Sequence, residues 1–176
     1  GALGAGDDGG TAEAVAHYHA MTGMRASMEP ECDGEQFTLA RTASGEVWSW
    51  GAEGANNALG QGGAEQKVVA EKVAALKGHV VTLLAAGEGH AAAVTADGAL
   101  FTFGEGGSGQ LGHGDEEKLL APKRVVAADW EGRCVVSVAC SEKHTAAVLD
   151  DGSLYTFGYG KSGLLGHGDT QNRLAP

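Results

Sequence analysis

The stretch Gly109-Gln110-Leu111-Gly112-His113-Gly114-Asp115 decides the fold, because most of it returns elsewhere in the chain. Its last five residues recur as Leu165-Gly166-His167-Gly168-Asp169, at a shift of 54. Shorter copies stand at Leu59-Gly60-Gln61-Gly62 and at Leu3-Gly4-Ala5-Gly6-Asp7. Self-similarity at a fixed period of this size is typical of solenoids and propellers. The chain is therefore expected to be an array of similar units.

Each unit contains a pair of strands joined by a turn. Residues 91–95 and 100–103 flank Asp97-Gly98, and Asp151-Gly152 stands one repeat later. Asp-Gly favours a two-residue hairpin in which both central positions have positive φ. Ser44-Gly45 is a weaker version of the same signal.

Two more strands complete the unit. Residues 80–85 and 135–139 are rich in β-branched side chains, which favours strands before the hairpins. A short fourth strand is expected around 123–126. Residues 64–77 have apolar side chains at helical spacing, but the repeat aligns part of this segment with the extended stretch that opens at Pro122. We therefore predict four strands per unit and no helix there.

Four antiparallel strands cannot bury their faces alone, so each unit must stack on its neighbours. Radial stacking gives a propeller. The predicted fold class is all-β, a β-propeller of four-stranded antiparallel blades, with a solenoid as the alternative.

The pattern resembles the regulator of chromosome condensation repeat family. The family signature is an aromatic-x-aromatic-Gly strand end, a Gly-Gln-Leu-Gly-x-Gly-Asp loop and Pro-x-x-Val. Phe103-Gly104, residues 109–115 and residues 122–125 show it in one copy. Pro30, inside another expected strand, departs from it. The resemblance implies a seven-bladed ring of which this chain supplies about three blades, the others coming from the same chain or a partner chain.

The chain is expected to form one partial propeller domain over residues 1–176. Its repeats are predicted at about 8–63, 64–115 and 116–169, with 1–7 and 170–176 in flanking blades.

Residues that recur with the repeat are expected to have structural roles, since a catalytic role needs one site and not a series. The predicted structural repeat positions are Gly51, Gly104, Gly158, Leu59, Gly60, Leu111, Gly112, Leu165, Gly166, His90, His144, Asp115 and Asp169. The histidines are expected to form hydrogen bonds in each blade, and the aspartates to accept backbone N–H groups.

No catalytic, cofactor or metal site is predicted. Residues 104–109 and 158–163 match the glycine fingerprint of dinucleotide sites, but no helix is expected to follow them. His17 and His19 could share one face of a strand, yet zinc needs three or four ligands.

Trp130, Glu131 and Arg133 are predicted to bind a partner. Residues 127–131 contain the two residues by which this copy exceeds its neighbour. Trp130 is therefore expected in a surface insertion, where an aromatic side chain can anchor a partner. Packing of Trp130 over the loop is the alternative.

The charge balance excludes several partner classes. Twelve Lys and Arg against 23 Asp and Glu give a net charge of −11, which repels nucleic acid and anionic membranes. No apolar run is long enough to insert into a membrane. Cys32, Cys134 and Cys140 include no C-x-x-C pair, which favours a reducing compartment. We expect an intracellular protein, cytoplasmic first, with nucleus or cilium as alternatives.

The resemblance implies a protein-interaction scaffold that is not an enzyme and presents propeller loops to a protein partner or a larger assembly. The alternative that it implies is a guanine-nucleotide exchange factor for a Ran-like small GTPase, the activity of the founding member. A third is ultraviolet-B sensing, which one plant relative performs with tryptophans in a Gly-Trp-Arg-His-Thr motif. Here Gly89-His90 and residues 142–145 stand in those places and contain no tryptophan.

Overall fold

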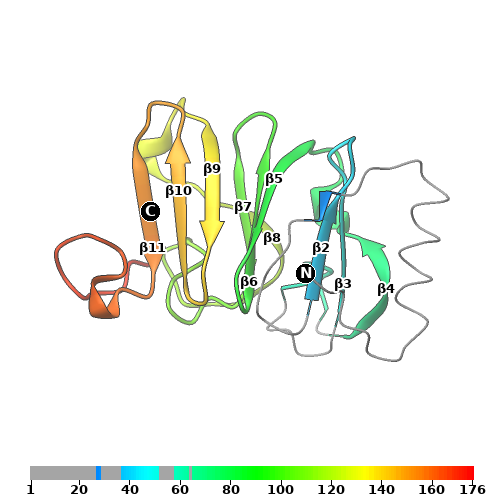
Figure 1. The fold of residues 1–176 in the computed structure, drawn as a ribbon, viewed down its shortest axis with the longest axis horizontal. Helices are drawn as coiled ribbons and strands as arrows, with labels where there is room; N and C mark the ends of the chain where they lie inside the picture. The colour runs from blue at the N-terminus through cyan, green and yellow to red at the C-terminus, as the bar shows by residue number, and fades with distance from the viewer. Residues whose placement is uncertain (1–26, 29–36, 52–57, 64) are drawn as a thin grey trace.

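The computed structural model describes residues 27–28, 37–51, 58–63 and 65–176, which form strands and short 3₁₀ helices (Figure 1). The strands are β1 (Ser27–Met28), β2 (Phe37–Arg41), β3 (Val47–Gly51), β4 (Lys67–Lys72), β5 (Val81–Ala86), β6 (His90–Thr95), β7 (Leu100–Gly104), β8 (Leu119–Arg124), β9 (Val135–Cys140), β10 (His144–Leu149) and β11 (Leu154–Gly158). The 3₁₀ helices are η1 (Ala74–Leu76), η2 (Ala128–Trp130) and η3 (Lys161–Gly163). The predicted copy at 3–7, His17, His19, Pro30 and Cys32 lie outside the described residues.

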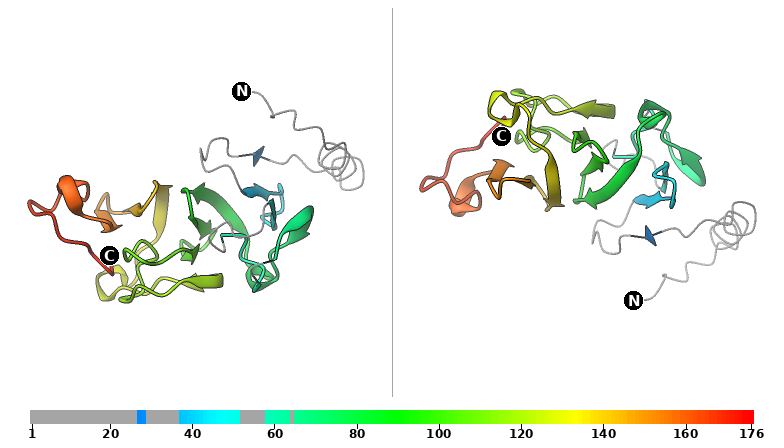
Figure 2. Two further views of the ribbon diagram at one scale, coloured as in Figure 1. Left: turned by 90° about the horizontal axis from the view of Figure 1, so that it is seen from below. Right: turned by 90° about the horizontal axis from the view of Figure 1, so that it is seen from above.

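The strands form three antiparallel sheets, which we call blade 1 (β1-β2-β3-β4), blade 2 (β5-β6-β7-β8) and blade 3 (β11-β10-β9). An isolated bridge between Gly158 and Arg173 extends blade 3. Figure 2 shows the sheets side by side in chain order, with blade 2 in the middle. The all-β prediction of antiparallel blades is confirmed, with four strands in blades 1 and 2 and three strands in blade 3.

Burial along the strands follows from this stacking. All six residues of β6 are buried, because blade 2 has a sheet on each side. In β10 only alternate residues, Thr145, Ala147 and Leu149, are buried, which is the period of a strand covered on one face. The core is therefore two layers between sheets, and its largest fully buried side chains include Phe103 and Phe157.

The segment predicted as strand against its helical spacing is a strand. Lys67–Lys72 forms β4 and pairs with β3, and only the three residues of η1 that follow are helical. Tertiary pairing therefore overrides the local apolar spacing.

The fourth strand lies earlier than predicted. We expected residues 123–126, whereas β8 is Leu119–Arg124, with Leu119 opposite Gly104 and Arg124 opposite Phe101. Pro122 lies within it. Because β8 is at the edge of its sheet, it tolerates a proline, which has no N–H group to donate.

The prediction of a two-residue turn at Asp97-Gly98 is wrong. Gly98 has a φ of +78°, but Asp97 is not in the positive-φ region. Thr95 N–H donates to the Ala99 carbonyl at 3.0 Å, which closes a three-residue loop with glycine last. The Thr95 hydroxyl explains why the three-residue loop forms instead of the two-residue turn. It accepts the Ala99 N–H at 3.1 Å and donates to the Asp97 carboxylate.

The predicted repeat limits fall within sheets. The limits at 63/64 and 115/116 precede β4 and β8, so residues 64–115 hold the last strand of blade 1 and three strands of blade 2. The repeats predicted at 64–115 and 116–169 therefore each cross from one sheet to the next.

Candidate functional site

A hydroxyl on the third strand of each blade holds the Leu-Gly turn. In blade 2, Thr102 Oγ1 donates to the Leu111 carbonyl at 2.7 Å and lies 3.0 Å from His113 Nε2. Because the hydroxyl proton goes to Leu111, His113 Nε2 carries a proton and donates to Thr102. Burial, and then the charge of Lys123, lower the pKa of His113, which favours the neutral ring. The same contacts recur in blade 3 at Thr156, Leu165 and His167, and in blade 1 at Ser49, Leu59 and Gln61.

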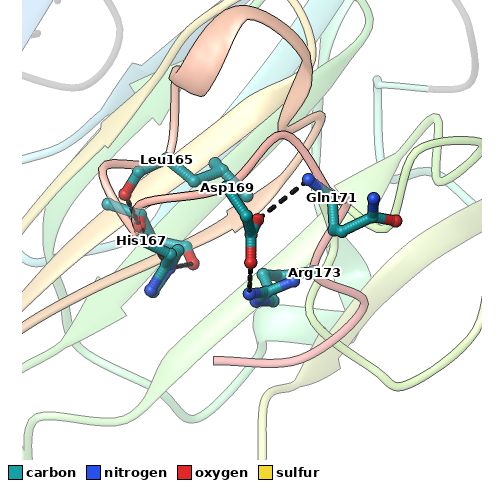
Figure 3. A network of polar contacts seen from close by, with 6 residues as sticks. Leu165, His167, Asp169, Gln171 and Arg173 are labelled. Atoms are coloured by element: carbon teal, nitrogen blue, oxygen red, sulfur yellow. Dashed lines mark hydrogen bonds and ion pairs between the residues drawn. The ribbon is translucent and has the colours of Figure 1, made fainter.

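The aspartates at the ends of these turns fix the loops that follow. Asp115 Oδ1 accepts the Glu117 N–H at 3.1 Å, and Asp169 Oδ1 accepts the Gln171 N–H at 2.9 Å. Arg173 Nη2 donates to Asp169 Oδ2 at 2.7 Å (Figure 3). These hydrogen bonds, the backbone one first, lower the pKa of Asp169. Both carboxylates are thus engaged within their own loops.

A polar tie joins blades 2 and 3. His90 Nε2 lies 2.8 Å from Thr145 Oγ1, which donates to the Gln110 carbonyl at 2.8 Å. Thr145 therefore accepts from His90, whose Nδ1 is unprotonated and has no hydrogen-bond partner among the described residues. Burial lowers the pKa of His90 to about 4, with His144 adding to the effect. Its ring is neutral and structural.

The Leu-Gly turn of one blade also packs on an aromatic ring of the next. A Cβ added to Gly112 would lie 2.7 Å from Phe157 Cε2, and one added to Gly60 would lie 2.9 Å from Phe103 Cε2. Both glycines have positive φ, +75° and +67°. The repeated turn is therefore part of each joint between blades.

The glycine fingerprints form close backbone contacts. A Cβ on Gly106 would lie 2.0 Å from the Glu117 carbonyl oxygen, and one on Gly160 would lie 1.8 Å from that of Gln171. In the described chain, β8 follows the first stretch, and only η3, of three residues, overlaps the second. Neither stretch has the helix that would turn its amides toward a phosphate.

A groove of about 640 Å³ opens at the connection between blades 2 and 3, lined by the β6–β7 turn and by the segment from Arg124 to Cys134. It brings together Trp130, Glu131 and Arg133, the three residues predicted to bind a partner. Arg124 and Asp97, neither of which was predicted to bind a partner, also line it. Assignment of these residues to partner binding stays a prediction.

Trp130 lines the groove, but its side chain is largely buried and does not project into solvent. Its side chain is 9% exposed, belongs to the core layer between blades 2 and 3, and packs edge-on against Tyr155 at 5.5 Å between ring centroids. The indole Nε1 is buried without a hydrogen-bond partner in the described chain.

The extra residues of this copy precede Trp130. One residue, Val73, separates β4 from η1, whereas three residues separate β8 from η2. Trp130 ends η2 as Leu76 ends η1, so it occupies a repeat position. The two added residues are therefore Val126 and Ala127, and the expectation that Trp130 itself stands in an insertion is wrong.

The groove carries charges of both signs. Arg133 Nη1 pairs with Asp151 Oδ2 at 3.1 Å. Asp97 is held by the Thr95 hydroxyl, which is the main reason that its pKa is lowered, and Arg124 contributes less.

A second hollow of about 310 Å³ lies at the opposite ends of the strands. Its lining includes Glu88, Glu105, Glu142 and Lys143, with Lys143 Nζ paired to Glu142 Oε1 at 2.8 Å. This hollow is acidic.

Two classes of feature were not found in the described part of the chain. No group of three or more His, Cys, Asp or Glu residues there is placed to hold a metal ion. The helices there are single 3₁₀ turns, too short to cross a bilayer.

The sequence matches a family model described as the regulator of chromosome condensation (RCC1) repeat over residues 44–94, 97–148 and 151–176. A second model with the same description matches residues 81–110 and 135–163. The first set of matches covers well over half of the chain.

Curated relatives share the repeats over most of this chain. The ultraviolet-B receptor UVR8 of Arabidopsis thaliana is 43% identical over 143 residues, which are 81% of this chain and 32% of UVR8. The probable E3 ubiquitin-protein ligase HERC4 of Mus musculus is 37% identical over 147 residues, 81% of this chain and 13% of HERC4. The chain thus spans a third or less of these relatives.

Solved structures show the same fold. Prp20p of Saccharomyces cerevisiae superposes with a TM-score of 0.71 at 21% identity, over 85% of this chain and 37% of Prp20p. Human WBSCR16 gives 0.68 at 22% identity, over 80% of this chain and 36% of WBSCR16. The three sheets are therefore consecutive propeller blades and not turns of a solenoid.

Proposed function

Because the chain belongs to the regulator of chromosome condensation repeat family, we propose that it is a protein-interaction module, with no catalytic chemistry of its own, that binds a protein partner through its loops. The observation that carries this proposal is the groove between blades 2 and 3, where Trp130, Glu131 and Arg133 meet Arg124 and Asp97. An intracellular location is part of the proposal.

The hydrogen bonds of the recurrent polar groups support a binding role over a catalytic one. His90, His113 and Asp169 are engaged in joints and loops, so they are not available as a reactive cluster. The groove instead combines apolar surface with charged groups, the composition of a protein-binding site.

Cross-linking of the natural full-length protein in its own cells tests the proposal. We expect one protein partner to be cross-linked repeatedly to residues around the groove, as identified by mass spectrometry. Cross-links confined to the same polypeptide, with no recurrent partner, would reject it.

The exchange-factor alternative has support from the fold alone. Prp20p, whose structure is described with its binding properties to Gsp1p and histones, shares the propeller at 21% identity. A nucleotide-release assay with Ran-like GTPases is the discriminating measurement, and acceleration of release would favour this alternative.

Ultraviolet-B sensing is supported by the 43% identity to UVR8. Against it, the loops before β6 and β10 carry Glu88 and Glu142 at the tryptophan position of the motif, whereas Trp48 and Trp50 lie in β3 and Trp130 in η2. A change of oligomeric state after ultraviolet-B illumination would favour this alternative over a partner-binding module.

A further inference from the structure

We propose that the groove between blades 2 and 3 binds an extended peptide segment of a protein partner, with a peptide carboxylate on Arg124 and an apolar peptide side chain on Val126. This inference rests on the proposed function and names the chemistry of the partner.

The added residues Val126 and Ala127 offer unpaired backbone groups at the edge of the groove. Ala127 has φ −127° and ψ 136°, the geometry of a strand. Within the described chain, neither the N–H nor the carbonyl of Val126 is hydrogen-bonded, and the N–H of Ala127 is also free. An extended peptide can bind to such a segment through main-chain hydrogen bonds.

The side chain of Val126 supplies apolar surface beside this backbone. It is 81% exposed, although its two neighbours along the groove, Val125 and Leu100, are buried. An exposed valine next to unpaired backbone offers a peptide side chain apolar contact at the point where main-chain bonds would hold the peptide.

Arg124 provides the charge. Its guanidinium has no ion pair or hydrogen bond with any described residue. Asp97, the nearby carboxylate, is already bonded to Thr95. A guanidinium at the rim of a groove pairs well with a carboxylate, which it can bind with two parallel hydrogen bonds.

In blade 1, the basic residue at the position of Arg124 is ion-paired, and this pairing is absent from blade 2. Lys72 ends β4 as Arg124 ends β8, and it forms an ion pair with Glu46. Ala99 stands in blade 2 where Glu46 stands in blade 1, since each follows the hairpin loop and accepts a threonine N–H. Ala99 lines the groove. The missing glutamate and the two added residues thus create an unpaired arginine beside an unpaired backbone.

Selection from a random peptide library tests the proposal on the full-length protein. A phage-displayed library of random dodecapeptides is panned against it, and enriched peptides are synthesised with a fluorophore for anisotropy titrations. We expect enriched sequences to place Asp or Glu within two residues of an aliphatic or aromatic residue.

Matched variants then locate the binding site. Arg124→Gln is expected to raise the dissociation constant at least tenfold. Lys123→Gln, with the same charge change on the opposite face of β8, is expected to change it less than twofold. Deletion of residues 126 and 127, which restores the connection length of blade 1, is expected to abolish binding. Ala99→Glu, which copies Glu46, is expected to weaken it as Arg124→Gln does.

Several outcomes would overturn the inference: no peptide whose binding depends on Arg124, enriched peptides without acidic residues, or equal losses from Arg124→Gln and Lys123→Gln. Unfolding midpoints of Arg124→Gln and Lys123→Gln should equal that of the parent, since the side chains of Arg124 and Lys123 are exposed. If the cross-linked partner is retained by Arg124→Gln, the inference fails while the proposed function stands. If no partner exists, the proposed function fails with it.

Discussion

His90 Nε2 and Thr145 Oγ1 lie 2.8 Å apart although they belong to different sheets, β6 of blade 2 and β10 of blade 3. The Thr145 hydroxyl also donates to the Gln110 carbonyl, so one hydroxyl of blade 3 is hydrogen-bonded to two segments of blade 2. At the other joint, Ala91 occupies the position of Thr145. The two joints are therefore not equivalent, because the hydroxyl that links blades 2 and 3 has no counterpart at residue 91.

Replacement of Thr145 by alanine should weaken that joint. It would leave the His90 N–H and the Gln110 carbonyl unpaired in a buried site, and we expect the free energy of unfolding to fall by about 2 kcal/mol. Urea unfolding of the full-length protein measures this. Thr145→Ser retains the hydroxyl and should lose less than half as much, and equal losses for the two variants would contradict the assignment.

Stability should fall on acidification because of His90. Its pKa is about 4 in the folded protein, against an ordinary value of 6.5. The unfolded chain therefore binds more protons between these values, so the contribution is full above pH 6.5 and is lost as the pH falls toward 4. The loss is about 3 kcal/mol at most. Urea unfolding between pH 7 and 4.5 measures it, and His90→Gln should have a shallower pH dependence. An unchanged slope in that variant would exclude His90 as the cause.

The hydroxyl of Thr102 should stabilise the Leu-Gly turn. Thr102→Val preserves the shape of the side chain but leaves the Leu111 carbonyl and the His113 N–H without their partner. We expect a loss of about 1–3 kcal/mol in unfolding free energy. Thr102→Ser copies Ser49 of blade 1 and should remain close to the parent protein. A serine variant as unstable as the valine variant would show that the methyl group, not the hydroxyl, matters.

Two glycines of one loop should differ in their tolerance of alanine. Gly112 and Gly114 have similar φ values, +75° and +84°, so both substitutions carry the same backbone cost of about 1 kcal/mol. A Cβ at Gly112 would collide with Phe157, whereas a Cβ at Gly114 would meet nothing within 4 Å. We expect Gly112→Ala to lower the thermal unfolding midpoint clearly more than Gly114→Ala. Equal shifts would mean that Phe157 moves aside freely.

The strands of the propeller were predictable because the repeat compares the same structural element several times. That comparison correctly assigned β4, whose local apolar spacing is helical. It failed where a single side chain decides the geometry. The turn at Asp97 depends on the Thr95 hydroxyl, and the four-residue error in β8 arose because an edge strand accepts Pro122 in its interior.

The candidate groove was only partly predictable. Trp130, Glu131 and Arg133 were found from a difference in repeat length, but the burial of Trp130 depends on Tyr155 in the next sheet. Arg124 was missed because whether it has an ion-pair partner depends on a residue next to the neighbouring strand. Comparison of Glu46 with Ala99 in the aligned repeats would have revealed an arginine without a partner.

The offset between sequence repeats and sheets has a consequence for limited proteolysis. Residues 115–118, between β7 and β8, are exposed and lie near a repeat limit. The fragment that begins there would keep β8 paired with β7 of the other fragment. A nick in this loop would therefore yield two pieces on a denaturing gel that still migrate together through a sizing column, because β8 of the second piece remains paired with β7 of the first.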